Sequence, residues 1–196
     1  NQQLANKINM LNLQEFATHY NDVYYTVGNG LYKRDDFSSP ETLGKGTDWQ
    51  DVIFRNALMK NYNLSVRGSD KGTSYSISGG YFSQDGIAIT SDFKRTTFRL
   101  DVTTKANEWL KFGSTVNVGY NTQNTGIASW NTIPYALYSS PQIAAYNSDG
   151  TFGGPMNDQE YGYSYGNPLA AALNTTRFNE KFNTRGNAFV TVNPYK

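Results

Sequence analysis

Residues 61–120 alternate between apolar and polar side chains. In the first alternating segment, 61–67, Tyr62, Leu64 and Val66 stand two positions apart with polar residues between them. Successive side chains on a β-strand point to opposite faces, so this spacing predicts a strand with one apolar and one polar face. The same pattern recurs at 74–81, 97–103 and 110–120. The alternation therefore predicts four antiparallel strands within 61–121, in a sheet that is apolar on one side only.

The connections between these strands differ in length. Short turns are expected at 68–72 and 105–109, and a longer loop between Phe82 and Arg95. A much longer connection, 122–182, precedes a further strand and the start of another short turn at 183–196. Chain direction reverses at each connection, so the short turns gather at one end of the sheet and the long loops at the other. Outer-membrane β-barrels have this layout, with short periplasmic turns and long extracellular loops.

Residues 1–60 follow a different pattern. Asn12 and Glu15 have the spacing of a helix capping box. The apolar residues that follow recur at helical intervals: Leu13, Phe16, Ala17, Tyr20 and Tyr24. The segment predicts a short amphipathic helix that ends near Gly28 and packs on a neighbouring surface, followed by a loop.

The composition favours an all-β fold, but it does not decide whether the sheet lies in water or in a membrane. Aromatic residues make up 15% of the chain and charged residues 17%, the latter below the roughly 25% usual in soluble domains. No apolar run approaches the roughly 20 residues of a membrane helix, but a barrel strand needs only about ten alternating residues. The net charge of +1 and scattered basic residues argue against nucleic acid as a partner.

The sequence offers little for catalysis. There is no cysteine, and His19 is the only histidine, so it is expected to be a surface residue rather than part of a triad or metal site. The segment 147–150 resembles part of a calcium loop and is expected to be a turn. The segment 44–47 lacks the glycine spacing of a phosphate-binding loop. We therefore predict no enzymatic activity, cofactor or metal.

The long connection is rich in aromatic residues and almost uncharged, with Asp149 as the only charged residue in 121–157. Flat aromatic faces among neutral hydrogen-bonding groups suit sugar rings, and they also suit a protein lid. The alternative is that these aromatic residues pack a core within the loop itself. The candidate substrate or lid contacts are Trp130, Tyr135, Tyr138, Tyr161, Tyr163 and Tyr165.

The polar side of the predicted sheet would line the interior of a barrel. Its notable polar residues are Arg67, Arg99, Asp101, Asn117 and Arg185. Charge is tolerated in a water-filled lumen. A soluble β-sandwich would also show this alternation, with the apolar side in its core.

Several segments resemble, in order and spacing, the start of the barrel in TonB-dependent transporters of the SusC/RagA type. They are 46–55, 61–66, 75–82, 84–87, 91–95, 98–100, 109–113, 167–170 and 185–187. The similarity covers nearly the whole chain and does not depend on one motif. It implies a fragment of a large transmembrane barrel of antiparallel up-and-down strands, with the short helix of 1–60 in an extracellular loop.

The resemblance also implies a function and partners. Members of the family import glycans or oligopeptides through the bacterial outer membrane, in contact with its lipid. They act with a SusD-like surface lipoprotein and with TonB, which would be contacted through a part absent from this chain. The competing hypothesis is a soluble β-rich carbohydrate-binding or adhesion module.

Overall fold

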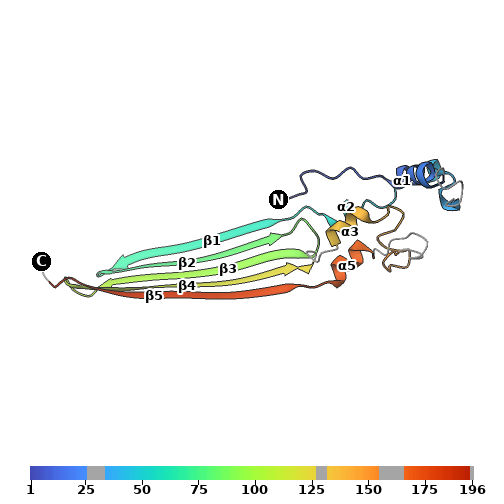
Figure 1. Ribbon diagram of the computed structural model, residues 1–196. Helices are drawn as coiled ribbons and strands as arrows, with labels where there is room; N and C mark the ends of the chain where they lie inside the picture. The colour runs from blue at the N-terminus through green and yellow to red at the C-terminus, as the bar shows by residue number, and fades with distance from the viewer. Residues whose placement is uncertain (26–33, 127–131, 155–165, 195–196) are drawn as a thin grey trace.

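The computed structural model describes residues 1–25, 34–126, 132–154 and 166–194. Its main feature is one antiparallel sheet in which the strands follow one another in chain order (Figure 1). The strands are β1 (Met59–Asp70), β2 (Thr73–Asp85), β3 (Ser91–Lys105), β4 (Leu110–Thr125) and β5 (Phe178–Val192). This confirms the predicted all-β class and the up-and-down order of the strands.

The strands are longer than the alternation predicted. β2 and β3 continue to Asp85 and from Ser91, into the segment assigned to a loop, and β5 begins at Phe178 rather than near residue 183. The residues added at the strand ends include many polar ones, which break the apolar periodicity. The backbone hydrogen bonds between strands do not depend on that periodicity, so the ladder continues beyond it.

The two ends of the sheet differ as expected (Figure 1). β1 and β2 are joined by Lys71 and Gly72 alone, with φ of 45° and 83°. Two positive φ values define the type I′ hairpin turn, which matches the twist of the flanking strands. This turn is shorter than the predicted one at 68–72, because β1 extends to Asp70. The helices lie at the opposite end of the sheet.

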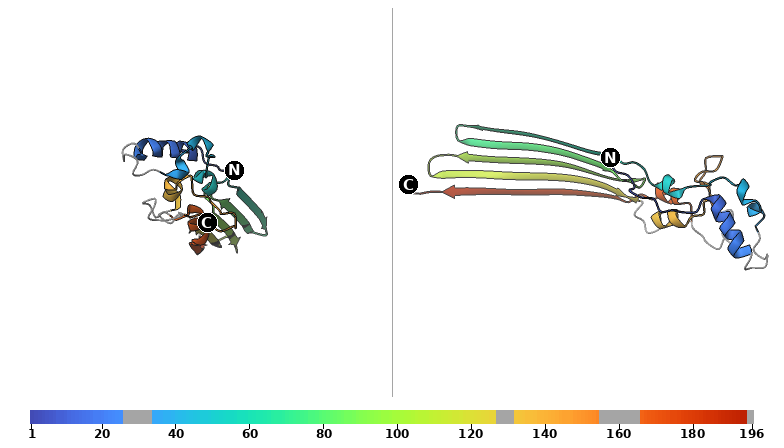
Figure 2. Two further views of the ribbon diagram at one scale, coloured as in Figure 1. Left: turned by 90° about the vertical axis from the view of Figure 1, so that its right-hand side faces the viewer. Right: turned by 90° about the horizontal axis from the view of Figure 1, so that it is seen from above.

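Three short helices form a helical cap beyond the loop end of the sheet (Figures 1 and 2). They are α2 (Trp49–Ile53), α3 (Thr132–Tyr138) and α5 (Pro168–Asn174). Their buried core consists of Trp49, Ile53, Ala88, Ala136, Leu169 and Ala172. The Trp49 indole Nε1 donates a hydrogen bond to the Ser140 carbonyl oxygen at 3.1 Å. The cap therefore has its own apolar core, separate from the sheet.

The helix α1 (Leu13–Tyr20) begins at the predicted capping box. The Asn12 side chain accepts from the Glu15 amide at 3.0 Å, and the Glu15 carboxylate accepts from the Asn12 amide at 2.9 Å. A π-helical turn (Asn21–Tyr25) follows, and the short 3₁₀ turns Asp35–Phe37 and Pro40–Thr42 come later. The buried Phe37 ring lies 5.9 Å from Phe16 and 5.4 Å from Tyr20 between ring centroids. The amphipathic face of α1 thus packs on Phe37, as the spacing predicted.

Arg34 packs against the aromatic cluster around Phe37. The Arg34 guanidinium lies 4.2 Å over the Phe37 ring and donates to the Gln142 side-chain oxygen at 3.0 Å. It also pairs with Asp36, and that hydrogen bond holds the pKa of the Asp36 carboxyl below its usual value. These contacts connect the α1 region to the segment after α3.

Gly46 sits where α1 meets the segment after α3, and we expect Gly46→Ala to destabilise this junction. Its φ is +71°, and an added Cβ would lie 2.3 Å from the Pro141 carbonyl oxygen and 2.7 Å from the Leu13 Cβ. The strain and overpacking should cost about 1–3 kcal/mol. Hydrogen exchange of α1 amides measures the loss. Gly44→Ala is the matched control, because its Cβ meets open space; equal effects of both changes would contradict the assignment.

Candidate functional site

The strand register places most of the large apolar side chains of the five strands on one side of the sheet, called here the apolar face; Phe82, Phe93 and Phe189 lie on the other side. One row across the strands is Tyr62, Tyr81, Thr96, Tyr120 and Phe182. The four aromatic rings of this row, called here the aromatic row, lie toward the loop end of the sheet. Trp109 lies beside the short turn at the other end. About ten residues separate Leu110 from Tyr120, which spans about 25 Å along the axis of a barrel with strands tilted by about 40°.

The apolar face is open. Leu64 is 74% exposed and Val190 69% exposed, although both belong to strands with well-formed pairing. The sheet is a single layer, and the helical cap lies beyond its end rather than over this face (Figures 1 and 2). Within the described ranges, no helix has the length and apolar character needed to cross a membrane.

The opposite side of the sheet, the polar face, brings together all five residues singled out from the sequence. Arg99, Asn117 and Arg185 are direct partners across β3, β4 and β5. Asp101 and Arg67 belong to the next row toward the short turns. The alternation thus predicted their common side correctly.

An ion pair with a bound hydroxyl lies at the centre of this group. The Arg99 guanidinium donates to both Asp101 carboxylate oxygens, at 2.7 and 2.9 Å. The Thr115 hydroxyl donates to the same carboxylate at 2.7 Å. Bidentate pairs of this kind fix side-chain orientation as well as charge.

The polar face also carries an aromatic group that the sequence reasoning missed. The Phe82 and Phe93 rings lie 6.1 Å apart between centroids, and the Arg95 guanidinium lies 5.6 Å over the Phe82 ring. These residues lie in or beside the segment for which the sequence predicts a loop, so the alternation predicts no shared face for them. Continuing the two-residue alternation past Phe82 is the signal that would have found them.

The predicted aromatic contacts in the long connection are only partly described. Tyr135 and Tyr138 both belong to α3, where Tyr135 is half-buried and Tyr138 is 68% exposed. Trp130, Tyr161, Tyr163 and Tyr165 lie outside the described residues. Tyr138 lines a groove of about 440 Å³ between the extended N-terminal segment, the segment before α2 and the end of α3. The exposed apolar side chains of Ile8, Met10 and Leu11 line the same groove.

Elsewhere in the connection, aromatic rings pack on one another. Tyr146 and Phe152 stack at 5.4 Å between centroids, on either side of the turn at 147–150. The Gly150 amide donates to the Asn147 carbonyl oxygen at 3.0 Å, so this segment is the predicted turn. A core within the loop, one of the two alternatives, thus accounts for these two rings.

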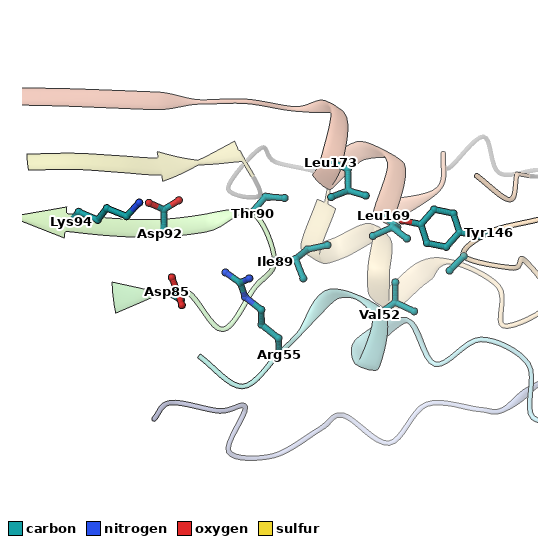
Figure 3. Close-up of a pocket in the computed structure, with 11 residues that line it drawn as sticks. Val52, Arg55, Asp85, Ile89, Thr90, Asp92, Lys94, Tyr146, Leu169 and Leu173 are labelled. Atoms are coloured by element: carbon teal, nitrogen blue, oxygen red, sulfur yellow. The ribbon is translucent and has the colours of Figure 1, made fainter. Parts of the chain in front are cut away.

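A larger cavity of about 850 Å³ lies between the sheet and the helical cap (Figure 3). One wall is apolar and includes Val52, Ile89, Leu169 and Leu173. The other wall carries charges, from Arg55, Asp85, Asp92 and Lys94. By register, the last three lie on the same side of the sheet as the apolar face. The cavity is therefore separate from the polar face, and its charges balance.

The Asn167 side chain links α5 to the segment 145–153. Its side-chain oxygen caps α5 by accepting from the Leu169 and Ala170 amides, at 2.9 and 3.1 Å. Its side-chain nitrogen donates to the carbonyl oxygens of Gly153 and Ala145, at 2.6 and 3.0 Å. One buried amide thus joins α5 to the turn segment, which no other side chain of that size can do without leaving a group unpaired.

His19 is exposed on α1. Among the described residues, no three His, Asp or Glu side chains are grouped so that they could hold a metal ion.

Three curated relatives resemble the chain in sequence. TonB-dependent receptor P26 of Formosa agariphila is 33% identical over 161 residues, which are 81% of this chain and 16% of that protein. TonB-dependent receptor P3 of the same organism is 30% identical over 77% of this chain and 15% of its own length. TonB-dependent receptor SusC of Bacteroides thetaiotaomicron is 34% identical over 56% of this chain and 11% of its own length. No protein-family model matches.

Solved structures share the fold. The RagAB peptide transporter aligns with a TM-score of 0.67 at 22% identity, over 99% of this chain and 25% of the matched chain. The RagAB peptide importer in its closed-closed state gives a TM-score of 0.65 over the whole of this chain and 25% of the other. The chain thus spans about a sixth of the length of the first two curated relatives and a quarter of the solved chains. It belongs to the SusC/RagA family of TonB-dependent receptors, and its sheet is part of their transmembrane β-barrel.

Proposed function

We propose that the protein to which this chain belongs is a TonB-dependent importer of the bacterial outer membrane. It takes up glycans or oligopeptides together with a SusD-like surface lipoprotein, and it is not an enzyme. The sequence relatives are named TonB-dependent receptors, and the solved relatives are named a peptide transporter and a peptide importer. Within that protein, this chain supplies barrel wall and extracellular surface.

The observation that carries the proposal is the two-sided register of the sheet. The apolar face, about 25 Å tall and bordered by aromatic side chains, has the height of the hydrocarbon-facing band of a barrel. The polar face, with Arg67, Arg99, Asp101, Asn117 and Arg185, then lines the lumen. The short turns lie in the periplasm, and the helical cap lies outside the cell.

The SusD-like partner would contact the groove beside Tyr138. Four exposed apolar side chains, those of Ile8, Met10, Leu11 and Tyr138, line it. Such exposed apolar groups are typical of protein interaction sites. The six aromatic residues singled out in the long connection remain our candidates for contact with the substrate or with this lid.

A soluble adhesion or carbohydrate-binding module explains the sheet less well. Such a domain buries the apolar side of its sheet under a second layer. Among the described residues nothing covers the central apolar face. Lipid would cover it instead.

Uptake in cells tests the proposal. A strain carrying the full-length receptor and its lipoprotein partner should accumulate oligosaccharide or oligopeptide cargo, and deletion of TonB should abolish the uptake. The receptor should fractionate with the outer membrane and require detergent for extraction. Equal uptake with and without TonB, or extraction in plain buffer, would contradict the proposal.

A further inference from the structure

The polar face carries an excess of positive charge that the net charge of +1 conceals. The comparison uses the rows in which all five strands pair, from Met59 to Asp70 of β1. In these rows the charged side chains of the polar face are Arg67, Arg95, Arg99, Lys181, Arg185 and Asp101. Those of the apolar side are Lys60, Lys94, Asp70 and Glu180. The cations therefore outnumber the acids on the polar face alone.

Four of these cations form a rectangle, called here the cationic frame: Arg95, Arg99, Lys181 and Arg185. Arg95 and Arg99 lie on β3, and Lys181 and Arg185 lie at the matching positions of β5, with β4 between them. Four residues along a strand span about 13 Å, and two strand spacings about 10 Å. The frame therefore has the dimensions of a few sugar residues.

The floor of the frame is open and lined by amides. Gly119 lies at its centre on β4, and a Cβ added there would meet no atom within 4 Å. Asn117 and Asn121 stand on either side of Gly119, between the cationic corners. The Asn121 side-chain oxygen is buried and has no hydrogen-bond partner among the described residues. The free space of the floor thus lies at Gly119, whereas the Asn121 oxygen has no exposed surface through which a ligand could reach it.

Most of the cationic frame has no internal counter-charge. Arg99 is paired with Asp101, but no described carboxylate forms an ion pair with Arg95, Lys181 or Arg185. Arg95 instead lies over the Phe82 ring, which is packed with Phe93. Unpaired cations beside an aromatic surface attract an anionic ligand with a flat apolar side.

We infer that the cationic frame binds an acidic saccharide, carboxylated or sulfated, on its way through the lumen. This rests on the proposed function, because the polar face must line the import path. Arginines pair with the acidic groups, the half-buried Asn117 amide bonds a hydroxyl, and the phenylalanines pack against the ring. A peptide fits less well, since its ammonium end would find no carboxylate within the frame among the described residues.

Binding to the full-length receptor tests the inference. The probes are oligogalacturonate, sulfated dextran oligosaccharide and neutral dextran oligosaccharide, titrated by calorimetry in detergent. The double variant Arg95→Gln/Arg185→Gln should bind the two acidic probes at least tenfold more weakly than the unchanged receptor. Its binding of these probes should also be less sensitive to salt. Lys60→Gln with Lys94→Gln removes the same charge from the other side of the sheet and should change affinity less than twofold.

A second variant does not depend on charge. Gly119→Val places a branched side chain on the open floor, where the structure has room, so the receptor should fold while affinity for the acidic probes falls severalfold. Unchanged binding of the acidic probes in both variants would overturn the inference, as would an equal loss for neutral dextran.

Two other outcomes identify a different occupant and also overturn the inference. If the arginine variant lowers the melting temperature of the ligand-free receptor and leaves saccharide binding intact, the frame holds an acidic segment of the receptor itself. If oligoglutamate binds as tightly as oligogalacturonate, the ligand class is peptide. TonB-dependent uptake of neutral cargo, measured separately, persists in each case unless the proposed function itself fails.

Discussion

Val116→Arg in the full-length receptor is expected to prevent stable insertion of the barrel, whereas Asn117→Arg leaves it folded. Val116 lies on the apolar face, paired with Leu100 and Gly186, about midway between the short turns and the aromatic row. An arginine facing lipid at the bilayer midplane costs about 2–4 kcal/mol. On the polar face the same side chain reaches water.

The two variants differ only in the face of the sheet that receives the arginine, because Val116 and Asn117 are neighbours on one strand. Folding into lipid vesicles, followed by the heat-dependent shift of folded barrels on gels, gives the fraction inserted. A fall in that fraction for Val116→Arg alone is the expected result. Equal loss for Asn117→Arg would mean that the polar face accommodates an arginine no better than the apolar face does, which would contradict a polar face that meets water.

Trp49→Ala is expected to unfold the helical cap while the sheet stays intact. The Trp49 side chain is 4% exposed and packs with Ile53, Ala136 and Leu169. Removing a buried tryptophan costs about 3–5 kcal/mol, through lost packing and the cavity that remains. Hydrogen exchange should accelerate strongly in α2, α3 and α5 and remain slow in β2 to β4.

Trp49→Phe is the conservative comparison. It keeps most of the ring volume but removes the indole donor to the Ser140 carbonyl oxygen. Its effect should be about 1–2 kcal/mol, the value of a lost hydrogen bond with modest repacking. If Trp49→Ala also loosened the strands, the cap and sheet would form one cooperative unit and the separate core would be wrong.

The part of the fold that follows a local period could be predicted from the sequence. Two-residue alternation gave the strands and the shared side of Arg99, Asn117 and Arg185, and the spacing of Asn12 and Glu15 gave the start of α1. These features depend on residues close together in the chain. The family resemblance agreed with them and is now supported by the relatives.

Features that depend on distant residues could not be predicted. The core of the helical cap brings together Trp49, Ala88 and Leu169 from three separate segments of the chain. No local sequence pattern predicts that these residues are in contact. The alternation does not predict the strand ends, because polar side chains there interrupt the apolar pattern. The hydrogen bonds between the backbones of neighbouring strands continue through these residues. Phe93 and Arg95 lie in this extended part of β3. Their place on the polar face, and with it the cationic frame, is therefore not predicted by the alternation.

Accessibility along β4 tests most directly that the apolar face meets lipid and the polar face meets water. The chain contains no cysteine, so single cysteines at positions 114–121 can be labelled without background from this segment. Labelling along β4 is expected to alternate with a period of two residues. Cysteines at odd positions should react with a membrane-impermeant reagent from the lumen side, and fluorophores at even positions should be quenched by a lipid-phase quencher. Uniform accessibility along the strand, or the reverse parity, would contradict this placement of the two faces.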